Sequence, residues 1–167
     1  MFFYSACKEH EQNGHHDDDL HEELHFEDDD GNHFDNKKQS VAELKKELTE
    51  KGFEIFDYID PDSGDTVVMQ QYFIAFLKRG QNRSQSKEEA DSLQNLHLEH
   101  LGKMYKLGYA DISGPFGDDG DIRGITIYNV PNLQMADSLA NSDPMVKAGR
   151  LEIEIHPWWA AKGFHLR

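Results

Sequence analysis

Residues 66–78, TVVMQQYFIAFLK, decide the fold of this chain. Successive side chains of a β-strand point to opposite faces of its sheet, so the segment presents two alternating sets of residues. Both sets are apolar, the first with Val68, Tyr72, Ile74 and Phe76 and the second with Val67, Met69, Phe73 and Leu77. A strand that is apolar on both faces belongs inside a sheet that is covered on both sides.

A helix and another strand precede this segment. Ser40 and Glu43 have the spacing of a capping box, in which each side chain satisfies a free backbone N–H at the start of a helix. Residues 53–59 then predict a strand, and residues 60–65 predict a turn rich in Asp, Ser and Gly. We expect residues 40–64 to form a helix and strand extension, with the strand paired to the central segment as a hairpin.

A longer amphipathic helix is predicted for residues 86–108. It starts with a second capping box, formed by Ser86 and Glu89. One helical face collects the apolar residues and two histidines, namely Leu93, Leu96, His97, His100, Leu101, Met104 and Leu107. A histidine on such a face is either a hydrogen-bonded core residue or a functional group, and the periodicity alone leaves both interpretations open.

Strand and helix patterns continue to the end of the chain. Residues 109–113 and 123–128 predict two strands of a hairpin, because turn residues separate them. Residues 132–142 predict a helix that ends before Pro144, since proline disfavours helical backbone at the residue before it. Residues 151–156 alternate apolar and polar side chains and predict a final strand.

The order of elements from Thr66 onward is therefore β-α-β-β-α-β. This is the ferredoxin-like arrangement of an α+β domain, in which two helices cover one face of an antiparallel sheet. The other face needs a cover, and a second copy of the chain is the simplest one. We expect a homodimer whose sheets pack together as a dimeric α+β barrel.

The composition is acidic. The chain has 167 residues, with 32 Asp or Glu against 17 Lys or Arg, and a formal net charge of −15. A protein that binds nucleic acid is expected to present a basic face to the phosphates. The balance therefore argues against a nucleic-acid partner, and the length allows one core with short extensions.

Much of this acid lies in residues 1–39, which are expected to form a disordered tether. Between residues 8 and 35 the chain has twelve Asp or Glu and six His, with few apolar residues to offset the cost in chain entropy. Imidazole beside carboxylates suits Zn²⁺, Cu²⁺ or Ni²⁺, and the candidate ligands are His15, His16, His21 and His25. A solvated acidic spacer explains the same composition without a metal.

The first residues resemble the lipobox of bacterial lipoproteins. Ser5 and Ala6 precede Cys7, the only cysteine, which would carry the lipid. The apolar stretch before it is shorter than a secretory signal requires, so we expect the true start to lie upstream. Lipidation would tether the protein to the cell envelope, on the periplasmic side. Without lipidation we expect a cytoplasmic protein.

A set of short motifs gives a second resemblance, to the YCII-related family. The motifs occur in order between about residues 65 and 160: His97-Leu98-Glu99-His100-Leu101, Gly108, Ser113-Gly114-Pro115-Phe116, Arg123-Gly124, Asp143-Pro144, Gly149-Arg150 and Pro157-Trp158-Trp159. The resemblance implies a dimeric ferredoxin-like fold for residues 65–160, with residues 161–167 as a tail. It also implies an active site that pairs a histidine with an acidic residue, here His97 and Asp143.

The resemblance implies a small-molecule enzyme. A histidine oriented by a carboxylate can act as a general base, which suits cofactor-free proton transfer or elimination of the lyase or dehydrochlorinase kind, with hydrolase-like chemistry a further option. No nucleophile motif, phosphate loop or dinucleotide fingerprint is present in the sequence. The candidate residues for binding the substrate are Ser113, Gly114, Pro115, His100 and Arg123.

A rival hypothesis is a module without catalytic activity. It would be held at the envelope and bind a small molecule or a metal, with the His- and Asp-rich arm as the metal collector. Metal titration of the full chain and of a chain that starts at Ser40 separates the two hypotheses.

Overall fold

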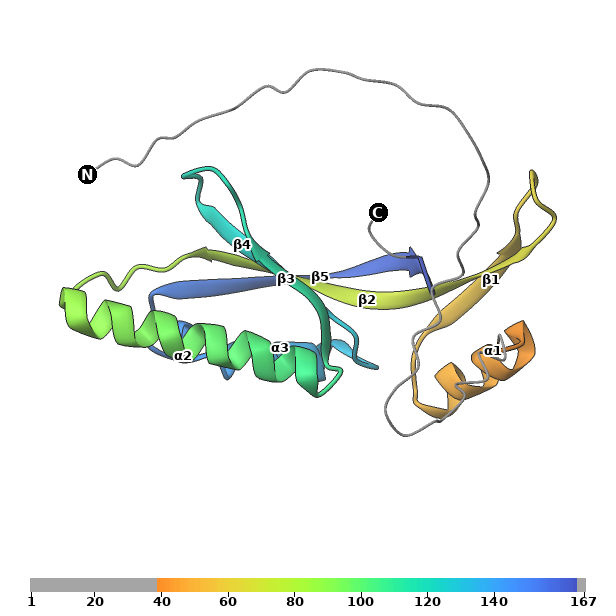
Figure 1. Cartoon of the computed structure of the whole chain (residues 1–167), viewed down its shortest axis with the longest axis horizontal. Helices are drawn as coiled ribbons and strands as arrows, with labels where there is room; N and C mark the ends of the chain where they lie inside the picture. The colour runs from red at the N-terminus through yellow and green to blue at the C-terminus, as the bar shows by residue number, and fades with distance from the viewer. Residues whose placement is uncertain (1–38, 165–167) are drawn as a thin grey trace, which may run out of the picture. The chain divides into compact units, whose positions relative to one another are not determined.

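The computed structural model of the protein describes residues 39–164 (Figure 1). The elements in chain order are α1 (Val41–Glu50), β1 (Ile55–Ile59), β2 (Thr66–Arg79), α2 (Lys87–Lys106), β3 (Ala110–Pro115), β4 (Ile122–Tyr128), α3 (Leu133–Asn141), α4 (Pro144–Lys147) and β5 (Leu151–Ala161). The predicted order from β2 to β5 is confirmed, with the short helix α4 added. Cys7 and the four candidate histidine ligands lie outside the described residues, so the lipidation and metal sites stay predictions.

The sheet is antiparallel and is organised around β2. Strand β5 pairs along one edge of β2, from Met69 opposite Ala161 to Arg79 opposite Leu151. The other edge pairs with β1 over the first residues of β2 and with β4 over the later ones, and β3 pairs with β4. The strand order β5-β2-β4-β3 is that of a ferredoxin-like sheet, and the interior position predicted for β2 is confirmed.

The core lies between one face of the sheet and the helices α2, α3 and α4. Phe73, Ala75 and Tyr128 of the sheet pack with Met104 of α2 and with Ala136 of α3. A second cluster joins Leu77 and Leu151 to Met145 of α4. Figure 1 shows α2 and α3 on the same side of the sheet, as a ferredoxin-like domain requires. No helix within residues 39–164 is long and apolar enough to cross a membrane.

Local signals explain where the helices begin. The Ser40 and Ser86 side chains each accept a hydrogen bond from the backbone N–H three residues on, so both predicted capping boxes are present. The Asn132 side chain caps α3 in the same way. The capping interactions are short-range, which is why the sequence predicts them well.

Three details differ from the prediction. Leu96 and Leu107 are 43% and 52% exposed, so the buried stripe of α2 is narrower than its apolar pattern. Strand β5 continues to Ala161, because β2 is long enough to pair with it over that whole length. Pro144 ends α3 and also begins α4, since its fixed φ suits the first position of a helix.

Candidate functional site

His97 and Asp143 form a buried pair, as the family resemblance implies. Their side chains come from α2 and from the α3–α4 junction, and the residues are 8% and 3% exposed. His97 Nδ1 lies 2.6 Å from Asp143 Oδ2. A carboxylate only accepts hydrogen bonds, so Nδ1 carries the proton and donates it. The lone pair of the neutral ring is then on Nε2.

Asp143 is itself held in place by its second oxygen. Oδ1 accepts a hydrogen bond of 2.8 Å from the backbone N–H of Met145, which makes Asp143 the N-cap of α4. Asp143 is therefore both a helix boundary and the partner of His97. Its carboxylate is fixed between a helix end and an imidazole, which also fixes the orientation of the His97 ring.

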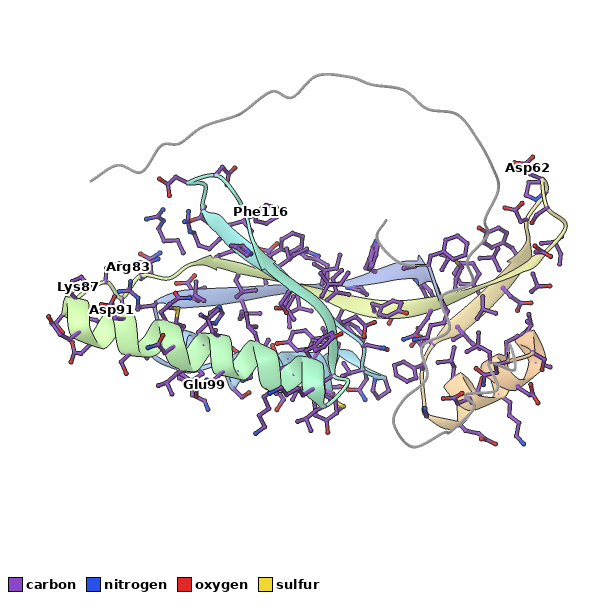
Figure 2. All side chains as sticks on the ribbon, viewed as in Figure 1. Asp62, Arg83, Lys87, Asp91, Glu99 and Phe116 are labelled. Carbon is purple, nitrogen blue, oxygen red and sulfur yellow. The ribbon has the colours of Figure 1, made fainter. Side chains whose placement is uncertain are left out.

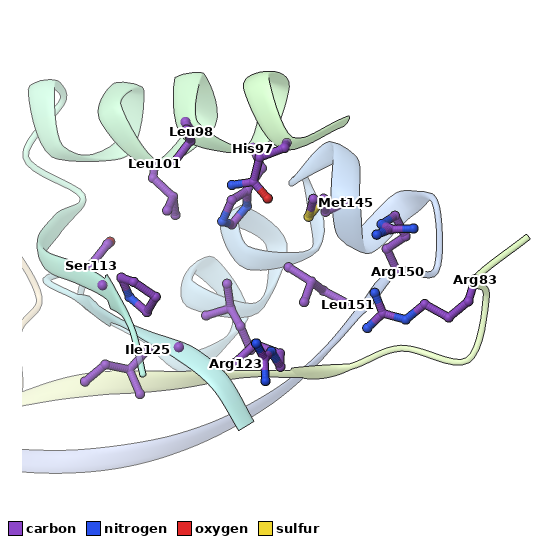
Figure 3. Close-up of a pocket in the computed structure, with 15 residues that line it drawn as sticks. Arg83, His97, Leu98, Leu101, Ser113, Arg123, Ile125, Met145, Arg150 and Leu151 are labelled. Carbon is purple, nitrogen blue, oxygen red and sulfur yellow. The ribbon is translucent and has the colours of Figure 1, made fainter. Parts of the chain in front are cut away.

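A cavity of about 360 Å³ lies beside this pair. In Figure 3 the His97 ring projects from α2 toward the sheet, with Leu98 and Leu101 on the same helix. The lining residues come from β2, the β2–α2 segment, α2, β3, β4, α4 and the start of β5: Leu77, Arg83, Gln94, His97, Leu98, Leu101, Ser113, Gly114, Pro115, Arg123, Gly124, Ile125, Met145, Arg150 and Leu151. The wall is mainly apolar and includes a few polar groups, as is typical of a small-molecule site.

Four of the five residues predicted to bind a substrate line this cavity with His97. Ser113, Gly114 and Pro115 contribute from β3, and Arg123 contributes from β4. The Ser113 hydroxyl lies 3.0 Å from that of Thr126, its neighbour across the strands. The catalytic and binding roles of these residues stay predictions.

His100, the fifth candidate, is not among the residues that line the cavity. It is partly buried, and its Nε2 has no hydrogen-bond partner within residues 39–164. Burial lowers the pKa of His100, although the nearby Asp143 carboxylate acts in the opposite direction. The neutral form of His100 is therefore favoured in the folded protein.

Arg123 reaches the cavity because the strand pairing is irregular at that point. Leu77 pairs with Gly124 whereas Lys78 pairs with Ile122, so Arg123 is an extra residue in β4. Such a bulge re-aims a side chain relative to the regular alternation. The guanidinium donates to the Gly120 carbonyl at 3.0 Å, which holds it against the β3–β4 turn.

Sequence reasoning missed two further arginines of the cavity, Arg83 and Arg150. Figure 2 shows Arg83 in the segment between β2 and α2, near Lys87 at the start of the helix. Arg150 follows α4, and its Nη1 donates to Gln85 Oε1 at 3.0 Å. Arg150 belongs to the family motif Gly149-Arg150, which was the one signal available. Arg83 lies in an irregular segment, and no sequence motif pointed to it.

The part of the chain that the structure describes contains no cluster of side chains that could bind a metal ion. Over residues 39–164, no three His, Cys, Asp or Glu side chains gather as a metal ion would require. The candidate ligands of the N-terminal arm lie outside this range.

A comparison of the sequence with known protein families agrees with the fold and with the His97–Asp143 pair. Residues 72–159 match the YCII-related domain, and the chain belongs to that family. Among solved structures the chain is similar to a 5-chloro-2-hydroxyhydroquinone dehydrochlorinase from Burkholderia phenoliruptrix AC1100, in complex with 2,5-dihydroxybenzoquinone. That match has a TM-score of 0.40 and 22% identity, and covers 52% of this chain and 92% of the other. No curated protein matches the sequence.

Proposed function

We propose that the YCII-related domain is a small-molecule enzyme that catalyses proton transfer or elimination, lyase-like, with His97 as the general base. The observation that carries this proposal is the buried 2.6 Å hydrogen bond between His97 and Asp143 at the wall of a cavity. No bound organic cofactor is part of the proposal, since the sequence has no phosphate loop or dinucleotide fingerprint.

The two residues have different roles. His97 Nε2 forms a new N–H bond as a C–H or O–H bond of the substrate breaks, and the electron pair of that bond stays on the substrate. In an elimination this pair forms a double bond, and the leaving group departs with its own bonding pair. In a proton transfer the proton returns from Nε2 to another substrate atom. Asp143 orients the ring and stabilises the imidazolium, so it is a positioning residue.

A purely structural role explains this geometry less well. A core histidine would use both ring nitrogens inside the protein, because a buried polar atom without a partner costs about 1–3 kcal/mol. Here Asp143 occupies only Nδ1, and the His97 side chain also lines the cavity. The remaining nitrogen is thus the atom that a ligand would meet.

Proton abstraction can be tested before the natural substrate is known. Small hydroxylated and halogenated aromatic compounds would be incubated with the protein in D₂O, and NMR would follow deuterium incorporation and loss of the leaving group. We expect His97→Gln to lose about 10²–10⁴-fold in rate, the usual contribution of a general base. Its melting temperature should change little if the role is catalytic.

The control is His156→Gln. His156 is a β5 residue whose side chain is 57% exposed and bonds to Glu154 at 2.8 Å, and it does not line the cavity. The His156→Gln substitution removes an imidazole from a surface position, so activity should be retained. Equal turnover by the wild type and His97→Gln would reject the proposed function.

A further inference from the structure

The cavity beside His97 has a basic end. Arg83, Arg123 and Arg150 all line it, although the chain as a whole has a formal net charge of −15. In Figure 3 the Arg83 and Arg150 side chains lie at one side of the site, and Arg123 lies between them and Ser113. Partial desolvation of the guanidinium and the charges of Arg150, Arg79 and Arg123 lower the pKa of Arg83, so Arg83 is close enough to these cations to be repelled by them.

The acidic side chains of the described region neutralise little of this charge. Within residues 39–164, neither Arg83 nor Arg150 forms an ion pair, and the Nε of Arg150 is buried without a hydrogen-bond partner. Arg123 meets one carboxylate, that of the 99% exposed Asp119, at 3.4 Å. Asp91 of α2 is paired with Lys87.

We propose that this cavity binds a small organic anion, a carboxylate or a phosphate ester, whose charged group meets Arg83, Arg123 and Arg150. The apolar body of the ligand would lie against Leu98 and Leu101, within reach of His97. This inference rests on the proposed function for the same cavity and names the substrate class.

The chemistry of the guanidinium group supports an anion. Its planar fork of N–H donors matches the oxygens of a carboxylate or phosphate, and it stays charged at physiological pH. An anion at this end would relieve the repulsion among the three cations and satisfy the buried Nε of Arg150. The same cations would stabilise the negative charge that develops on the substrate when Nε2 of His97 removes a proton.

The test uses benzoate, phenyl phosphate and benzamide as probes. They share a phenyl ring, and benzamide carries no charge. Calorimetric titration of the full chain at low salt should show that at least one anion binds about tenfold or more tightly than benzamide. The tighter of the two anions identifies the carboxylate or the phosphate as the preferred group. Added NaCl should weaken that binding, because salt screens the charges.

Matched variants assign the binding to the cavity. Arg83→Gln should weaken binding of the preferred anion about tenfold or more, and because Arg83 is exposed its loss should leave the fold intact. Arg150→Gln should have a similar effect. Arg79→Gln is the control, since it removes the same charge nearby from a residue that does not line the cavity. Thermal unfolding of each variant accompanies the titration.

The outcomes separate this inference from the proposed function. Benzamide binding as tightly as both anions, or equal losses in Arg83→Gln and Arg79→Gln, would overturn the anion site. Anion binding that His97→Gln retains, with no turnover of any compound, supports the site and rejects the enzyme. Turnover of neutral compounds that requires His97, without anion binding, keeps the enzyme and rejects the inference.

Discussion

Asp143 uses each of its two carboxylate oxygens for a different purpose. Oδ1 caps α4 through the Met145 N–H, and Oδ2 accepts from His97. Removing the side chain therefore affects the stability of a helix end together with the protonation of the imidazole. Substitutions can separate the two effects, because asparagine keeps one acceptor oxygen and replaces the other with a donor NH₂ group.

The first prediction concerns Asp143→Asn. The amide oxygen can still cap α4, while the NH₂ group would face His97 Nδ1 and move the ring proton to Nε2. The base is then lost although the cap is kept. We expect activity to fall about 10²–10⁴-fold, with a small change in the free energy of unfolding. The ¹⁵N shifts of the imidazole in NMR report the tautomer directly, and an unchanged tautomer would contradict the prediction.

Asp143→Ala is the companion variant, because it removes the cap as well. It should lower the free energy of unfolding by about 0.5–2 kcal/mol relative to Asp143→Asn, the usual value of an N-cap. Chemical denaturation measures the difference. Equal stability of the two variants would show that the cap contributes nothing.

His100 should make the fold sensitive to mild acid. Its pKa is lowered by burial, so between that lowered value and the unfolded value of about 6.5 the unfolded chain binds more protons. The contribution of His100 to stability is thus complete above pH 6.5 and is lost as the pH falls through the folded pKa. His100→Leu should lose less stability than the wild type over this window. Denaturation midpoints at a series of pH values test this, and parallel curves would contradict it.

At the scale of elements, the end of β2 is fixed against the segment after α4. A Cβ on Gly80 would lie 2.2 Å from the Gly149 carbonyl oxygen, and the Gly80 N–H donates to the Arg150 carbonyl at 2.9 Å. This close approach of two backbones holds the end of β2, from which the chain continues to Arg83, beside Arg150. Glycine is required because any side chain would separate them.

Gly80→Ala should therefore destabilise the protein by about 1–3 kcal/mol through overpacking, and it should also weaken anion binding by shifting Arg150. Gly102→Ala is the matched control. Its Cβ would meet nothing within 4 Å, on an exposed position of α2, so it should stabilise the helix by about 0.5–1 kcal/mol. Thermal and chemical unfolding of both variants give the comparison, and equal effects would remove the packing argument.

The sequence predicts elements well where the signal is local. Ser86 and Glu89 are three residues apart, so their capping box can be identified without knowledge of the fold. His97 and Asp143 are separated by 46 residues, and only the family resemblance joined them before the structure did. Arg83 could not be predicted, because its place depends on how an irregular segment passes over the cavity. The bulge at Arg123 likewise depends on the register between two strands.

At the scale of the whole molecule, the sheet has a second face, which is directed away from α2, α3 and α4. Cross-strand pairs place Ile74 opposite Ile127, Phe76 opposite Ile125 and Tyr72 opposite Trp158 on this face. Leu151, Ile153 and Ile155 pack toward the helices, so β5 presents Glu152, Glu154 and His156 on the second face.

The homodimer therefore remains a prediction, now with a defined surface. Ile112 pairs with Ile127 and is 39% exposed, and Trp158 is 41% exposed, so apolar groups extend across this face of the sheet. Burying them against a second copy would remove apolar area from water, which is the main driving force of association. We expect sedimentation at micromolar concentration to give twice the mass of one chain.

Ile112→Lys tests which surface associates. The position is exposed enough for a folded single chain to accept a charge, whereas a dimer that covers this face would bury that charge at a cost. We expect the dissociation constant to rise at least about tenfold. Tyr105→Lys is the control, since Tyr105 is 67% exposed on α2, on the helix side of the sheet. A wild-type chain that sediments as a monomer, or a dimer that both variants weaken equally, would show that this face is not the interface.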